Sequence, residues 1–463
     1  MIQPTGQLVR IDALGVADAA REVRGEGQRG VSVLIELAPH GWPRARVIAV
    51  GSAAAVDGHE AAGLPSLVRL ARPGSVLIPG LVNAHTHLDL THIGPRPHDP
   101  EAGFVPWIEM IRRHRLGTRE EIAASVSLGA SLSLRAGVVA VGDFAGAVGG
   151  RASLSGYEAL AATALAGVSF MEFFALGAGE ERGLAGVREA IGRAEARGLF
   201  RQPPPRVRFG IQPHSPYSVG PAAFIAAAEM LAGRGPMCTH LAESAEERAL
   251  VEGASGPLRR MLEGFGLWTD NLDRVFGRPV SPVEHVRDCA LGRVSLFAHV
   301  NDARDADLGL LADAGASVAY CPRASAYFGA ERHFGAHRFR EMLQSGVNVA
   351  LGTDSIVNLP ADAPTSGMSI LDEMRFLHRY DGTDARMLLE MGTLNGARAL
   401  GLPEEAFEIC EGATIAGVVC VPIEDGPGGG RSLAEAAIRS GAPPELLVHD
   451  RSPPAARGWD ASA

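Results

Sequence analysis

The chain has 463 residues, 46% of them hydrophobic and 21% charged, which favours one large domain with an accessory domain over one small domain. A formal net charge of −10 without a long basic run excludes nucleic acid and an anionic membrane surface as expected partners. No membrane-length apolar run and no signal peptide are found, so we expect a cytoplasmic protein with no membrane partner.

Short β-prone pieces dominate the beginning of the chain. Residues 31–37 and 45–51 read as strands of a small sheet, separated by Gly and Pro. The apolar pieces at 407–410 and 415–422 are expected to return to this sheet. We therefore predict a small β-sandwich domain built from residues 1–75 and 401–450. The Pro-, Ala- and Ser-containing tail, residues 451–463, is expected to be disordered.

Between these two segments, apolar strand candidates alternate with Ala- and Leu-rich helical stretches, such as residues 119–135, 183–197, 222–233, 245–264 and 305–314. Such alternation implies parallel strands joined by helical crossovers. Eight units predict an α/β fold of the (β/α)8 TIM-barrel type over residues 76–400, with a doubly wound open sheet as the alternative. The eight strand candidates are residues 76–87, 138–144, 168–175, 207–214, 236–241, 294–300, 316–321 and 347–352.

Polar side chains follow many of these strands, and barrel enzymes place their chemistry at the carboxyl ends of strands. The first strand ends in His85 and His87, and alternation along a strand directs both imidazoles to one side. A His-x-His pair is a metal-ligand arrangement, although such pairs also occur as core or surface residues. The strand ends of the remaining chain add four more candidates: His214, His240, His299 and Asp354.

Two carboxylates accompany these histidines. Glu243 lies three residues after His240, where it can shuttle protons for a water on a metal ion, or simply complement a helix dipole. Asp354 closes the last strand, where it can act as an oxygen ligand or cap the next helix.

The chain contains no lysine, so all 43 basic residues are arginine. This absence excludes Schiff-base chemistry, a P-loop and a two-metal centre bridged by lysine. The five cysteines are scattered, without a Cys-x-x-Cys pair, and are expected to be small buried residues.

Several segments together resemble the amidohydrolase superfamily, in the branch of cytosine, guanine and adenosine-type deaminases and related chlorohydrolases. They are PGLVNAHTHLDLT at 79–91, HLAES at 240–244, AHVN at 298–301, YCPR at 320–323 and ALGTDS at 350–355. The resemblance implies one divalent metal ion, zinc or iron, held by His85, His87, His240 and Asp354. It also implies that Glu243 shuttles protons and that His299 contacts the water or the intermediate.

Three further residues are candidates for substrate contact. His214 is similar to the strand-four histidine that touches substrate in nucleoside-type deaminases. The segment Phe104-Val-Pro-Trp107 is similar to a stretch of aminodeoxyfutalosine deaminases, so Trp107 is a candidate for stacking on a purine, with helix packing as the alternative. Arg323 is expected to contact a carboxylate or phosphate, or to support its loop.

We therefore expect a hydrolytic deaminase acting on an aminopurine nucleoside of the aminodeoxyfutalosine or adenosine type, with release of ammonia. Glu243, His299 and Asp354 are its expected catalytic residues. The alternatives are a chlorohydrolase or a deaminase of guanine, a triazine or a pterin, and a non-catalytic metal-binding relative. The expected partner is a small heterocyclic substrate. Family members often form dimers, so a homodimer is an alternative to a monomer.

Overall fold

The computed structural model describes residues 6–25, 30–37, 42–43, 45–64, 66–360, 367–423 and 431–448. The expected disordered tail, residues 451–463, lies outside these ranges. None of the described helices is both long and apolar enough to cross a membrane. The helices are α1 Ala53–Asp57, α2 Phe104–His114, α3 Arg119–Arg135, α4 Ser155–Ala161, α5 Glu180–Ala196, α6 Pro221–Leu231, α7 Ala245–Gly253, α8 Gly256–Gly264, α9 Leu272–Val275, α10 Pro282–His285, α11 Asp305–Asp313, α12 Pro322–Tyr327, α13 Ala330–Phe334, α14 Phe339–Gln344, α15 Ile370–Asp381, α16 Ala385–Met391, α17 Leu394–Ala399 and α18 Leu433–Arg439.

The middle of the chain forms two parallel sheets of four strands, in the orders β6-β7-β8-β9 and β10-β11-β12-β13. Their strands are β6 Leu81–Thr86, β7 Val138–Ala145, β8 Ala166–Phe173, β9 Val207–Pro213, β10 Cys238–Leu241, β11 Leu296–His299, β12 Ser317–Tyr320 and β13 Asn348–Leu351. Every residue of β7 and β8 is buried, as expected for strands covered on both faces. The predicted α/β class is confirmed.

Parallel bridges connect these two sheets at both of their edges. Ile211 of β9 bridges to Met237, just before β10. Thr86 of β6 bridges to Asp354, just after β13. The carboxyl ends of the first and the last strand therefore lie next to each other.

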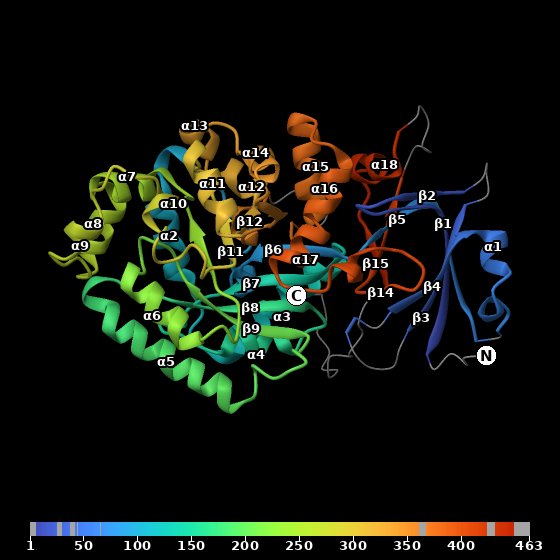
Figure 1. Cartoon of the computed structure of the whole chain (residues 1–463), viewed down its shortest axis with the longest axis horizontal. Coiled ribbons are helices and arrows are strands. Elements are labelled where there is room, and N and C mark those ends of the chain that lie inside the picture. The colour runs from blue at the N-terminus through green and yellow to red at the C-terminus, as the bar shows by residue number, and fades with distance from the viewer. Residues whose placement is uncertain are drawn as a thin grey trace.

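Both ends of the chain contribute to one further sheet of eight strands (Figure 1). Figure 1 shows its blue amino-terminal strands beside the red strand β15. The sheet order is β14-β4-β3-β1-β5-β15-β16, and β2 pairs with β1. The strands are β1 Gln7–Ala17, β2 Glu22–Arg24, β3 Val31–Leu37, β4 Ala45–Ser52, β5 Val68–Pro79, β14 Thr414–Ile415, β15 Val418–Pro422 and β16 Glu445–Val448. The predicted return of the later segment to the amino-terminal sheet is confirmed for residues 415–422.

Three predicted elements differ from the structure. The strand expected at 76–87 is divided at Gly80, where a Cβ atom would lie 2.6 Å from the Val139 side chain. Its first part, up to Pro79, belongs to β5 and pairs with β15. The helical stretch 245–264 is two helices, because Ala254 turns the chain with a positive φ of 44°. Residues 407–410 form no strand.

Position 167 in β8 requires glycine for two reasons: its backbone conformation and the close packing of its neighbours. Its φ of +124° is unfavourable for any residue with a side chain, and a Cβ atom would overlap the Val141 carbonyl oxygen of β7. Gly198, just after α5, also has a positive φ, of +68°, but has no atom within 4 Å of a Cβ position. Alanine substitutions at these two positions therefore distinguish the cost of backbone strain alone from the cost of strain together with steric overlap.

We predict that Gly167→Ala destabilises the protein by about 2–4 kcal/mol, because strain and overlap add. Gly198→Ala, the matched control, is expected to cost about 1 kcal/mol from strain alone. Urea-unfolding midpoints of the two variants and the parent protein measure this difference. Equal midpoints for the two variants would contradict the predicted overlap in β8.

Candidate metal centre and active site

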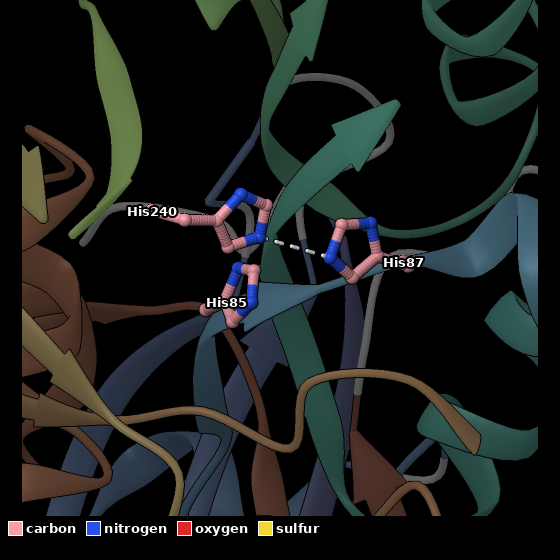
Figure 2. Close-up of side chains that lie close together, drawn as sticks. All are labelled: His85, His87 and His240. Carbon is pink, nitrogen blue, oxygen red and sulfur yellow. Dashed lines mark hydrogen bonds between the residues drawn. The ribbon is translucent and has the colours of Figure 1, made fainter. Parts of the chain in front are cut away.

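The polar residues predicted at strand ends meet at the carboxyl edge of the parallel sheets. His85 lies in β6, His240 in β10 and His299 in β11. His87 directly follows β6, and Asp354 lies three residues after the end of β13. Ligand atoms of His85, His87 and His240 lie within 4.8 Å of one another, and so do those of His85, His299 and Asp354. Figure 2 shows the rings of His85, His87 and His240 turned toward a common centre.

Hydrogen bonds to carbonyl groups fix the tautomers of two of these histidines. The Nδ1 atom of His87 lies 2.9 Å from the Phe144 carbonyl oxygen, and that of His240 lies 2.9 Å from the His214 carbonyl oxygen. A carbonyl oxygen only accepts, so both Nδ1 atoms carry the proton. Burial also lowers the pKa of both imidazoles, in His240 to about 4, so the rings are neutral at pH 7.

The Nε2 atoms of His87 and His240 consequently present lone pairs to each other, at a distance of 3.3 Å (Figure 2). Two lone pairs repel, and no proton is available between them. A cation bound by both atoms removes the repulsion. Tetrahedral Zn–N bonds of about 2.0–2.1 Å set ligand nitrogens about 3.3 Å apart, which matches this spacing.

His85 and Asp354 extend the same centre. His85 is fully buried, and neither of its ring nitrogens has a hydrogen-bond partner. Its Nε2 atom lies 3.5 Å from Oδ1 of Asp354, which is also 3.5 Å from Nε2 of His87. Asn358 donates to the other carboxylate oxygen of Asp354 at 2.9 Å. Buried polar atoms without partners are rare in proteins, and a metal ion beside Asp354 would satisfy the Nε2 atom of His85.

Strained backbone surrounds this centre. Asp354, His299 and Ala242 have φ values of 55°, 73° and 54°, which residues with side chains seldom adopt. Hydrogen bonds between neighbouring strand ends hold these conformations: Asp354 donates its N–H to the His85 carbonyl oxygen at 3.1 Å, and Asp302 donates to that of Ala242 at 3.0 Å. Such strain persists only where the surroundings impose it, and it gathers at functional sites.

Glu243 lies beside the centre and does not face the solvent. It is buried, and its Oε1 atom lies 3.4 Å from Nε2 of His299. Burial, together with the charge of Asp354, raises the pKa of Glu243 well above its ordinary value. Glu247 positions this segment, because its carboxylate accepts the backbone N–H groups of Ala242 and Glu243 at 3.0 and 2.9 Å. Glu243 is thus held where it can take up and release a proton.

The three residues expected to contact substrate occupy different surroundings. His214 lies next to the centre, its ring 5.1 Å from that of His240, and burial lowers its pKa to about 3. Trp107, on α2, stacks on Phe104 with ring centroids 5.5 Å apart. Its buried Nε1 atom has no hydrogen-bond partner.

Arg323 is buried and engaged with its own protein. Its Nε atom donates to Glu373 at 2.7 Å, and its guanidinium also donates to the Gly367 and Ser369 carbonyl oxygens at 2.7 and 3.2 Å. These contacts favour the expected alternative, in which Arg323 supports the loop after β12.

Two residues beside His214 were missed by the sequence reasoning. Glu172, near the end of β8, has an Oε1 atom without a hydrogen-bond partner, 3.9 Å from Nε2 of His214. Arg115 donates to Oε2 of Glu172 at 3.3 Å and to Asp89 at 2.5 Å. Glu172 fits the rule of polar residues at strand ends, because β8 ends at Phe173, but it lies inside the apolar strand that the sequence predicts at 168–175. No sequence pattern marks Arg115, which follows α2.

The sequence profile of the Amidohydrolase family matches residues 76–420. The aminodeoxyfutalosine deaminase of Deinococcus radiodurans is 28% identical over 77% of this chain and 81% of its own length.

Two solved structures share the fold. The aminofutalosine deaminase of Helicobacter pylori, in complex with methylthio-coformycin, has a TM-score of 0.70 at 18% identity, covering 95% of this chain and 97% of that one. The zinc complex of the atrazine chlorohydrolase TrzN from Arthrobacter aurescens has a TM-score of 0.67 at 20% identity, covering 97% of each chain. These structures do not separate the two reactions, because their scores are so close.

Asp143, near the end of β7, is a fully buried carboxyl group. Its Oδ1 atom accepts the Leu88 N–H at 3.0 Å. Burial, reinforced by the charge of Asp89, raises the pKa of Asp143 from 3.8 to about 8. The folded protein therefore keeps a proton that the unfolded chain releases near pH 4.

We predict that this group makes the free energy of unfolding fall as the pH rises from about 4 to about 8, by at most about 1.4 kcal/mol per pH unit. Asp143→Asn cannot ionise, so the variant should gain stability relative to the parent across this range. Urea-unfolding midpoints at pH 5, 6.5 and 8 measure the effect. Asp288→Asn, at an exposed site, is the control. Parallel pH profiles for the parent and Asp143→Asn would refute the prediction.

Proposed function

The chain belongs to the amidohydrolase family, and on this premise we propose that it is a metal-dependent hydrolytic deaminase of an aminopurine nucleoside. One observation carries the proposal: the lone pairs of His87 and His240 face each other, with a buried glutamate, Glu243, beside the same centre. A structural histidine cluster needs neither feature.

We also propose that the two parallel sheets form one closed (β/α)8 barrel, which the bridges at both edges support. The barrel would comprise residues 76–400. The small domain would comprise residues 1–75 and 401–450 and fold as a β-sandwich. Strand β5 continues the small sheet as far as Pro79.

His85, His87, His240 and Asp354 would hold one divalent ion. Their spacing of 3.3–3.5 Å favours tetrahedral zinc, while three nitrogens and a carboxylate also suit ferrous iron. When bound, such an ion lowers the pKa of a coordinated water from about 15.7 toward neutrality. Asn358 and the two carbonyl groups that bind Nδ1 atoms would keep the ligands oriented.

The chain's own residues would carry the protons. Glu243 would accept a proton from water at a carboxylate oxygen while the remaining hydroxide adds to the amine-bearing ring carbon. Its raised pKa makes this carboxylate a stronger base for that step, and the proton would then pass to the adjacent ring nitrogen. His299, 3.4 Å from Glu243, would stabilise the new oxygen on the ring carbon. The proton of the new hydroxyl group would then pass to the amine, so that the C–N bond breaks, ammonia leaves and a ring carbonyl remains.

The nucleoside class of the substrate is supported by the Deinococcus radiodurans relative, named aminodeoxyfutalosine deaminase. His214 lies where it could contact the purine, and Trp107 lies on the nearby helix α2. Neutral His214 can hydrogen-bond an uncharged ring.

We predict that the metal-loaded protein releases ammonia from an adenine nucleoside, such as aminodeoxyfutalosine, adenosine or S-adenosylhomocysteine. Guanine and cytosine serve as comparison substrates, and a chelator should abolish the release. Ammonia and bound metal are both measured. Chloride release from a chlorotriazine, with no ammonia from any nucleoside, would instead establish the chlorohydrolase alternative.

We predict that Glu243→Gln retains stoichiometric metal but lowers kcat at least about 100-fold, because the amide keeps the shape and cannot shuttle the proton. His240→Ala is the contrasting variant, which should lose the metal itself. Metal analysis and steady-state kinetics distinguish the two. Near-normal turnover by Glu243→Gln would remove this residue from the mechanism.

A further inference from the structure

The backbone that carries His299 is strained at the end of β11. His299 has a φ of 73° and the next residue, Val300, has a φ of 51°, so two successive residues with side chains adopt the left-handed conformation. The peptide group between them affects where the His299 ring points, because both are attached to the same Cα atom. Such conformations persist only where neighbouring groups hold them.

This peptide group is held from two sides. Its N–H group, which belongs to Val300, donates to the Leu241 carbonyl oxygen of β10 at 2.9 Å. Its carbonyl oxygen, which belongs to His299, accepts a hydrogen bond from Nε2 of His337 at 2.9 Å. The first bond joins the backbones of two neighbouring strands. The second comes from a side chain, so a substitution can remove it without altering the strands.

His337 lies in the loop between α13 and α14, and its ring is fixed there. It stacks on Tyr320, at the end of β12, with ring centroids 3.8 Å apart. The His299 carbonyl oxygen only accepts, so Nε2 of His337 carries the proton. Burial lowers the pKa of His337 to about 4, so the ring is neutral at pH 7. Its buried Nδ1 atom has no partner among the described residues, which leaves the bond to His299 as the polar contact of this ring.

The side chain of His299 faces the proposed catalytic centre. Its Nε2 atom lies 3.4 Å from Oε1 of Glu243, and its ring centroid lies 5.1 Å from that of His85. In the proposed reaction, His299 stabilises the new oxygen on the ring carbon. A displacement of about 1 Å in a catalytic group can lower a rate about 100-fold. A bond that fixes the backbone of His299 therefore bears on the rate.

We propose that His337 is a positioning residue, which holds the ring of His299 in place for catalysis by binding the His299 carbonyl group. The inference rests on the proposed deaminase function and adds to it a residue that acts through His299. Loss of this bond should lower kcat and leave KM nearly unchanged, because the metal ligands and the groups that bind the substrate stay in place.

Two substitutions at this position test the proposal. His337→Leu and His337→Gln both remove the ring that stacks on Tyr320, but only glutamine keeps an N–H group of similar reach. We expect His337→Leu to lower kcat at least about tenfold, with KM changed less than about threefold and metal content unchanged. His337→Gln should recover most of this loss. His333→Leu, the same change at an exposed histidine of α13, is the control and should leave kcat unchanged.

A double-mutant cycle distinguishes positioning from a general loss of structure. If His337 acts through His299, adding His337→Leu to His299→Ala should lower kcat less than about twofold further. His337→Asn, whose amide is one methylene shorter than that of glutamine, is a second variant without the bond and should behave as leucine does. Equal kcat values for the leucine and glutamine variants, or a further loss of about tenfold in the His299→Ala background, would overturn the proposal.

Crystal structures of the parent protein and His337→Leu give a readout that needs no turnover. We expect the His299 ring to move by about 1 Å or more in the variant, while His87 and His240 keep their positions. An unmoved His299 ring would overturn the positioning role and leave the deaminase proposal standing. A parent protein that releases no ammonia from any nucleoside would overturn the proposed function, and the position of His299 in the variant would then decide whether His337 holds it.

Discussion

Unprotonated imidazole nitrogens that face each other in a buried site repel, and much of the surrounding structure acts to hold them there. The two carbonyl groups that fix the rings of His87 and His240 belong to Phe144 and His214, at the ends of β7 and β9. Each of these two histidines is thus oriented by a backbone carbonyl group from a different strand than its own. The parallel arrangement of strands is therefore what makes the centre geometrically defined, and a cation is what makes it electrostatically favourable.

The same region holds several residues other than glycine whose φ is positive. Positive φ angles at Asp354, His299 and Ala242 direct these segments inward at the points where strands end. Hydrogen bonds across adjacent strand ends impose these angles, so the shape of the site is maintained at some cost in the stability of the fold. Glu247 has a similar task, since its carboxylate satisfies the backbone of Glu243 in a place where water cannot.

The strand-end rule selected the candidate ligands His85, His87 and His240, because their positions follow from local periodicity, and the structure brings these three side chains together. It assigned the strand regions of the α/β core for the same reason. Glu172 obeys the rule but was hidden in an apolar stretch, whereas Asn358 and Arg115 act through contacts across the fold that no local pattern encodes. The sequence predicts one continuous strand at 76–87, whereas the structure divides it at Gly80. The close approach of Val139 to Gly80 exists only in the folded protein, so no local pattern could predict this division. The bonds of Arg323 to Glu373 are equally non-local.

The pairing of Pro79 with Val418 has a consequence for how this protein folds during its synthesis. During translation, β5 is synthesised early, whereas β15 is synthesised only after all the parallel strands. One edge of β5 therefore stays unpaired through most of synthesis. Exposed strand edges invite pairing with other chains. The strand that leads directly into β6, which carries His85, thus gains its second neighbour only after all the parallel strands are made, and a nascent chain that stalls before residue 418 would carry an unpaired strand edge.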